Sequence, residues 1–131
     1  MKLSRLICCT FLGLLMLPMG CDSKQEKVQK NMTSLMGEYA DVLEGIKTNT
    51  DFIDAKPKLE RIGAKMKDLM NEYKALPTPT ADEQKKMNKE FEESNKKVTE
   101  RISKEMQRLE KVGVSPMQLM ESMKVSPEMV P

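Results

Sequence analysis

Apolar residues recur at alternating steps of four and three along most of this chain. The repeat is clearest in its middle part, where no position is missed from Ala55 through Leu59, Ile62, Met66, Leu69 and Tyr73 to Leu76. Such spacing places the apolar side chains on one face of an α-helix and is typical of helices that pack in bundles. The chain is therefore predicted to be all-α.

The predicted fold is an antiparallel three-helix bundle with helices at about 24–47, 51–76 and 81–112 and a short fourth helix at about 116–124. The connections between these segments are short and polar, which makes consecutive helices antiparallel neighbours. In the third helix, the core-facing places between Phe91 and Val98 fall to Ser94 or Asn95. The apolar face is predicted to be interrupted there.

Capping residues define where the helices begin and end. A Ser or Thr followed three residues later by Glu can satisfy the free amides of a helix start reciprocally. The predicted boundary residues are Ser23 with Glu26, Asp51, Thr80 with Glu83, Ser115 before Pro116, and Gly113 as a C-terminal stop.

The positions of proline and glycine lead to two local predictions. Pro57 falls inside the apolar pattern, and we expect an early helix start near Asp51 with a bend at the proline. Gly37 and Gly45 lie off the apolar face, where glycine costs about 1 kcal/mol relative to alanine. Close approach of a neighbouring helix is one explanation for these two glycines.

Charged residues on the third helix follow a spacing of four. Glu and Lys at this spacing, in this order, stabilise a helix by a few tenths of a kcal/mol for each pair. A run of this kind is usually a solvated face, and that is the reading we favour here. The predicted pairs are Glu92 with Lys96, Glu93 with Lys97, and Glu100 with Lys104.

The first twenty residues have the layout of a secretory signal. Lys2 and Arg5 precede an apolar run from Leu6 to Leu17, and a small residue, Gly20, stands before Cys21. The apolar run is shorter than the roughly 20 residues that a transmembrane helix needs. The Gly20-Cys21 junction resembles the lipobox of bacterial lipoproteins, in which cleavage leaves a lipid-modified cysteine as the first residue. The competing reading is an ordinary secreted protein with an accidental cysteine.

This resemblance implies a division of the chain and a location. Residues 1–20 would be a removed signal peptide, 21–22 the lipid anchor and a minimal tether, 23–124 the helical bundle, and 125–131 a frayed C-terminal tail. The protein is expected in the cell envelope, attached to a membrane through lipid on Cys21 and facing the periplasm. The choice between inner and outer membrane stays open. The turn at Pro77–Thr80 is expected near the lipid, and the other end of the bundle is where a partner would be met.

Charge and residue types limit the function. Lys2 and Arg5 account for the net charge of +2, so the chain without residues 1–20 carries equal numbers of basic and acidic side chains. Such a balance gives no strong attraction to nucleic acid. Two of the three cysteines leave with the signal, and the chain has no histidine. The usual proton shuttle, thiol nucleophile and zinc sites are thereby excluded, so neither an enzyme nor a cofactor is expected.

Methionine is the one unusual feature of the composition. Met117, Met120 and Met123 are spaced by three in the predicted fourth helix. Packing against the bundle core is the simplest reading of this stripe. Thioethers are also suited to a partner groove and to Cu(I).

Two hypotheses from different classes follow. The favoured one is a non-enzymatic, membrane-anchored helical structural or protein-interaction module, which binds another envelope protein or its own copies. The alternative is a periplasmic ligand-binding or chaperone-like module that takes up Cu(I), lipid or unfolded chains. Thr80-Ala81-Asp82-Glu83-Gln84 at the start of a long helix is similar to the Leu-Thr-x-x-Gln element of periplasmic Spy-type chaperones. A capping box explains the same residues without that function.

Overall fold

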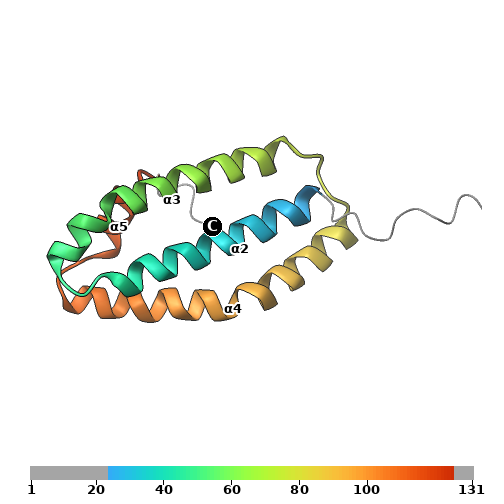
Figure 1. Ribbon diagram of the computed structural model, residues 1–131. Coiled ribbons are helices and arrows are strands. Elements are labelled where there is room, and N and C mark those ends of the chain that lie inside the picture. The colour runs from blue at the N-terminus through green and yellow to red at the C-terminus, as the bar shows by residue number, and fades with distance from the viewer. Residues whose placement is uncertain (1–23, 126–131) are drawn as a thin grey trace, which may run out of the picture.

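A computed structural model of the chain describes residues 24–125. They form four α-helices, namely α2 (Lys24–Gly45), α3 (Asn49–Ala75), α4 (Ala81–Lys111) and α5 (Pro116–Met123) (Figure 1). The predicted all-α bundle of three long helices and a short fourth is therefore confirmed. The predicted bounds agree with the observed ones to within two residues.

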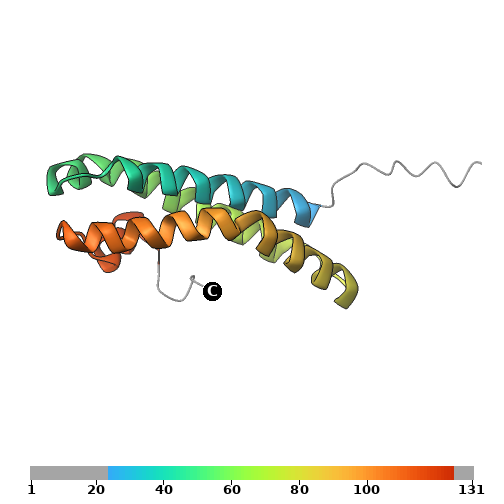
Figure 2. The same ribbon diagram turned by 90° about the horizontal axis from the view of Figure 1, so that it is seen from below.

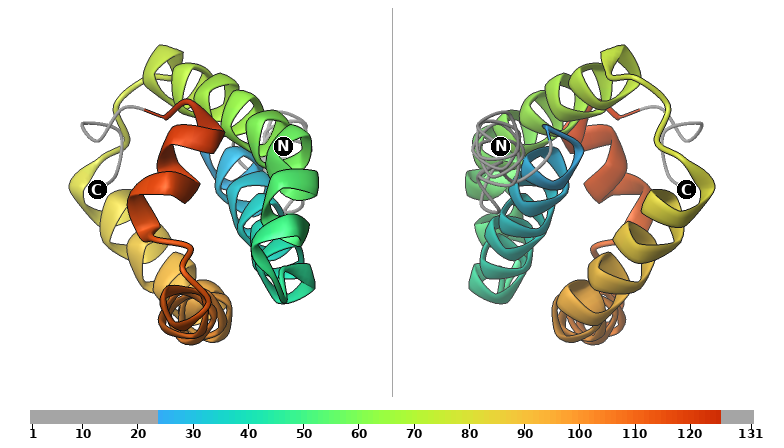
Figure 3. Two further views of the ribbon diagram at one scale, coloured as in Figure 1. Left: turned by 90° about the vertical axis from the view of Figure 1, so that its left-hand side faces the viewer. Right: turned by 90° about the vertical axis from the view of Figure 1, so that its right-hand side faces the viewer.

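Helix α2 is the central element of the bundle. It packs along both α3 and α4, whereas α3 and α4 make only marginal contact with each other. Helices α2 and α4 run side by side in the same direction. Helix α3, which lies between them in the sequence, runs in the opposite direction (Figures 1 and 2). The resulting space between α3 and α4 is occupied at one end by α5, which packs on α3 (Figure 3).

The two ends of the bundle hold different turns. We call the end where α2 starts the proximal end and the end where α2 finishes the distal end. At the proximal end, the side-chain amide of Gln25 donates a hydrogen bond of 2.9 Å to the carbonyl of Pro77, so the α3–α4 turn lies beside the start of α2. The distal end holds the α2–α3 and α4–α5 turns (Figure 1).

The main apolar core lies toward the distal end, where α5 completes it. Its buried members come from all four helices and from the α2–α3 and α4–α5 turns: Leu35, Tyr39, Leu43, Ile46, Phe52, Ala55, Leu59, Ile62, Leu109, Val114, Leu119 and Met123. Toward the proximal end, Val28 and Met87 are buried outside this cluster. The bundle is thus packed more completely at the distal end than at the proximal end.

Two arginines of α4 attach it to α2. The guanidinium of Arg101 pairs with Asp41 and Glu44, each at 2.8 Å. That of Arg108 donates a hydrogen bond of 2.9 Å to the carbonyl of Leu43, in the last turn of α2. Carbonyls there lack helical partners, and a cation beside them also opposes the helix dipole. These contacts favour the parallel alignment of α2 and α4.

Helix starts agree with the predicted capping in two of three described cases. Thr80 with Glu83 forms a capping box, and Ser115 caps α5 with Pro116 in the first turn. The prediction of Asp51 as the cap of α3 was wrong. Thr48 is the cap, and Asp51 is the third helical residue, whose carboxylate accepts the Thr48 amide at 2.9 Å. Ser23 lies outside the described residues.

Gly113 ends α4, as predicted, with a positive φ of 86°. Its amide donates to the carbonyl of Glu110, and the amide of Val114 donates to that of Leu109. These two bonds define a Schellman motif, which glycine favours because it has no Cβ. The turn directs the chain from α4 into α5.

Helix α3 contains both a proline and a closely approached glycine. It begins before Pro57 and continues through it, as expected, and Figure 1 shows the helix curving over its first half. The explanation offered for Gly37 and Gly45 was wrong, because no neighbouring atom lies within 4 Å of a Cβ built at either. Close approach occurs instead at Gly63, where a Cβ would meet the carbonyl oxygen of Met123 at 1.9 Å.

The predicted pairs along the charged face of α4 do not form. Within α4, the ion pair at a spacing of four is Lys86 with Glu90, at 3.8 Å. Glu92, Lys96, Glu100 and Lys104 make no ion pair with one another or with the rest of the described chain. The charged residues that do pair mostly bridge different helices.

Candidate functional site

The residues predicted to carry the lipid lie outside the described part of the chain. These are Cys21 and the preceding Gly20. The first described residue, Lys24, begins α2 at the proximal end. No helix within residues 24–125 is both long enough and apolar enough to cross a membrane.

Exposed apolar side chains occur at the opposite end. Among residues 24–125, the large hydrophobic residues that are exposed are Ile53, at 56 %, and Met117, at 70 %. Ile53 lies in the second turn of α3 and Met117 in the first turn of α5, and both helices start at the distal end (Figure 1). We call these two residues the distal patch.

The methionine stripe of α5 is divided between solvent and core. Met117 is in solvent, Met120 is half-buried and Met123 is only 7 % exposed. Leu119 is fully buried beside them. A Cu(I) site made of all three thioethers would therefore require Met123 to leave the core, whereas Met117 is free to meet a partner.

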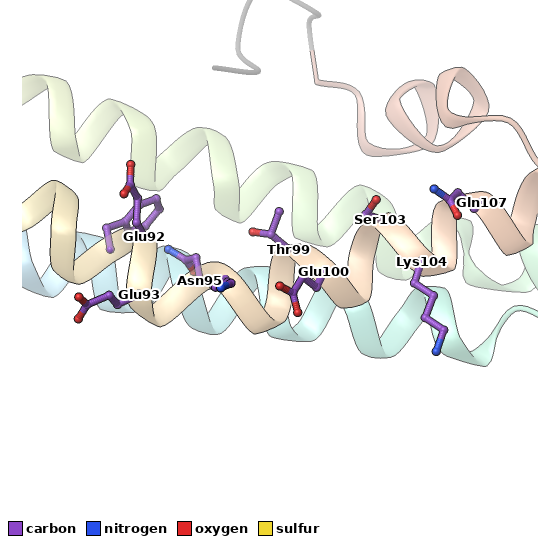
Figure 4. Close-up of a pocket in the computed structure, with 10 residues that line it drawn as sticks. Glu92, Glu93, Asn95, Thr99, Glu100, Ser103, Lys104 and Gln107 are labelled. Carbon is purple, nitrogen blue, oxygen red and sulfur yellow. The ribbon is translucent and has the colours of Figure 1, made fainter.

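A shallow hollow of about 810 Å³ extends along α4. Figure 4 shows Thr99, Ser103 and Gln107 directed toward the side of α3, and Lys104 directed away from it. The hollow is lined by Phe91, Glu92, Glu93, Asn95, Lys96, Thr99, Glu100, Ser103, Lys104 and Gln107. Its open, charged surface has the character of an interaction surface more than of an enclosed ligand pocket.

Asn95 occupies the place where an interruption of the apolar face was predicted. It is 4 % exposed, and neither its side-chain oxygen nor its nitrogen has a hydrogen-bond partner in the described structure. The hydroxyl of Tyr39 in α2 is likewise buried without a partner. A buried polar group without a partner costs about 1–3 kcal/mol. Both groups therefore reduce the stability of this part of the bundle.

Asn95→Leu is expected to raise the free energy of unfolding by about 1–2 kcal/mol, because it replaces an unpartnered amide by an apolar side chain of similar size. Urea unfolding followed by circular dichroism measures the change. Ser94→Leu is the matched control, since Ser94 is exposed and should change stability little. A loss of stability in Asn95→Leu would mean that the amide has a partner after all.

The described residues offer little for metal or acid–base chemistry. No group of three or more Asp, Glu, Cys or His side chains in residues 24–125 is arranged to hold a metal ion. The carboxylates of Asp51 and Glu83 have lowered pKa values, and in both the largest cause is a hydrogen bond from a backbone amide at a helix start. These two pKa shifts are therefore a consequence of helix capping.

In comparison with known proteins, no family model, no curated protein and no solved structure matches this chain. Sequence reasoning placed Met117 in a candidate stripe but did not identify Ile53. Nothing in the apolar pattern distinguishes Ile53 from a core residue except its position one step after Phe52, which is buried.

Proposed function

We propose that this protein is a non-enzymatic lipoprotein of the bacterial cell envelope that acts as a helical structural or protein-interaction module. Lipid on Cys21 would attach it to a membrane, with the bundle facing the periplasm. The observation that best supports an interaction role is the distal patch. Its two exposed apolar residues, Ile53 and Met117, lie at the end of the bundle away from Lys24.

The arrangement suits a tethered module for a physical reason. Lys24 is only three positions after Cys21, and three extended residues reach about 10 Å. A body held this closely presents its proximal end to the lipid and its distal end to the surrounding space. Apolar side chains at the distal end are therefore available to a protein partner, where burying them would be favourable.

The test joins anchoring and contact in one experiment. A photoreactive amino acid replaces Met117 in the full chain, which is expressed in cells. The same replacement is also made in a chain that carries Cys21→Ser. We expect the parent to fractionate with membranes and to form a defined adduct at position 117. Cys21→Ser should leave the membrane fraction and lose most of that adduct, because the tether no longer concentrates the protein near its partner.

The control places the same photoreactive residue at Glu72, which is exposed in the proximal half of α3. An adduct of equal yield at both positions would argue against the distal patch. Membrane fractionation of Cys21→Ser equal to that of the parent would argue against the lipid anchor. The two halves of the proposal can therefore fail separately.

A second candidate function is favoured by the wider spacing of helices at the proximal end. Met70 and Tyr73 of α3 are only half-buried there, because α4 makes no more than marginal contact with α3. Such a surface could hold an unfolded segment, as a chaperone-like module would. A chaperone of this kind would suppress aggregation of an unfolding client protein while itself remaining monomeric. An interaction module with a defined partner would not suppress that aggregation.

A further inference from the structure

Helix α4 carries a ridge of charges that alternate in sign. Glu92, Lys96, Glu100 and Lys104 follow one another at steps of four and all line the hollow described above. All four are exposed. On a helix, residues four apart form a continuous surface ridge, and such ridges are the elements that interlock when two helices pack. We call these four residues the α4 ridge.

The α4 ridge has no electrostatic partner in the part of the chain that the structure describes. Charges elsewhere on the bundle connect helices, as Arg101 does with Asp41 and Glu44, Lys65 with Glu38, and Lys124 with Glu60. No residue of the ridge forms an ion pair within residues 24–125. Its carboxylates and ammonium groups are therefore available to an outside partner.

The order of the charges is self-complementary in one orientation. Suppose that a second copy of α4 lies antiparallel to the first and that the two-fold axis between them passes at the level of Val98. Lys96 of each copy then faces Glu100 of the other. Glu92 then faces Lys104 in the same way. A parallel two-fold arrangement would place each residue opposite its own equivalent and so set like charges against each other. Only the antiparallel arrangement pairs every charge of the ridge.

Neighbouring side chains are compatible with close approach. Thr99 and Ser103 line the hollow beside the ridge and are small, which leaves room for a second helix at these two positions. Interlocking of the steps-of-four ridges of two helices is also the commonest way in which helices pack in globular proteins. A two-fold interface of this kind uses the same patch on both copies.

We propose that two copies of this protein associate through the α4 ridge, antiparallel about Val98. The α2 starts then lie at opposite ends of the pair. This consequence joins the proposed anchoring: two lipid-anchored copies paired in this way would connect two facing membrane surfaces. The association itself does not depend on the lipid, so it can be tested in its absence and can fail while the anchoring holds.

The test uses residues 21–131 with Cys21→Ser, since every buried core residue of the described chain lies between Val28 and Met123. Sedimentation equilibrium measures association of the parent, of Lys96→Glu, of Glu100→Lys and of an equimolar mixture of these two variants. Each single variant turns two attractive contacts into two repulsive ones, and we expect association at least about tenfold weaker. The mixture should regain the affinity of the parent, because both central contacts are then attractive again.

Two further samples separate pairing between chains from effects within the helix. The double variant Lys96→Glu with Glu100→Lys exchanges the central charges and should associate as the parent does. Lys97→Glu makes the same charge change one position off the ridge and should weaken association much less than Lys96→Glu. Added salt should weaken the parent dimer, because its ion pairs are exposed.

A parent chain that remains monomeric up to about 1 mM, the weak limit of specific binding, would overturn the proposal. So would a mixture of the two single variants that associates no better than either alone. Circular dichroism checks that each variant keeps its helices. We expect that it does, because one pair of charged side chains four apart in a helix changes the stability of that helix by only a few tenths of a kcal/mol.

Discussion

Gly63→Ala is expected to lower the free energy of unfolding by about 2 kcal/mol, although alanine is the better helix former. A Cβ at this position would lie 1.9 Å from the carbonyl oxygen of Met123, and backbone atoms cannot move aside as a flexible side chain can. Overpacking of this kind costs about 1–3 kcal/mol, and here it displaces the end of α5 from α3. Urea unfolding measures the change, and faster proteolysis within α5 reports its displacement.

Gly37→Ala is the matched control in α2. No atom lies within 4 Å of a Cβ built there, so the only effect should be the gain in helix propensity, up to about 1 kcal/mol. The two alanine substitutions should thus change stability in opposite directions. If Gly63→Ala stabilised the protein as Gly37→Ala does, α5 would not pack on α3 as described.

Raising the pH from 10 to 12 is expected to destabilise the protein more than its Tyr39→Phe variant. Burial raises the pKa of Tyr39 from its ordinary 10.0 to about 12. Between these values the unfolded chain releases the phenolic proton while the folded chain keeps it, so stability falls as pH rises. One pKa unit corresponds to about 1.4 kcal/mol, and the loss should approach 2–3 kcal/mol at pH 12.

The comparison with Tyr39→Phe isolates this one group, since the two proteins share every other side chain. Unfolding free energies measured at intervals between pH 8 and 12 give the difference curve. Below pH 9 the variant should be at least as stable as the parent, because the hydroxyl it removes is buried and has no hydrogen-bond partner among the described residues. A difference that stays constant up to pH 12 would mean that the Tyr39 hydroxyl reaches solvent.

The spacing of apolar residues was sufficient to predict the helices and their number. Leu59 and Ile62 are buried on the predicted face of α3, and Leu35 and Leu43 on that of α2. These predictions succeed because helix periodicity and end signals are local in sequence. The Thr80 capping box and the Gly113 stop were identified for the same reason.

Local signals were less reliable where two residues competed for one role. Thr48 and Asp51 can both cap a helix, and the capping box assigns one role to each. The predicted Glu–Lys pairs of α4 followed from spacing alone, but long charged side chains in solvent gain little by pairing. Side chains such as Arg101 and Lys65 instead bridge to other helices.

The three long helices and the short one follow from local sequence, because the pattern that specifies a helix lies within a few turns of it. The packing of the helices against one another placed α2 between α3 and α4, brought α5 against Gly63, and buried Asn95 without a partner among residues 24–125. It also decided that Ile53 and Met117 share the distal end. Each of these features depends on residues far apart in the chain, whose meeting no local pattern specifies.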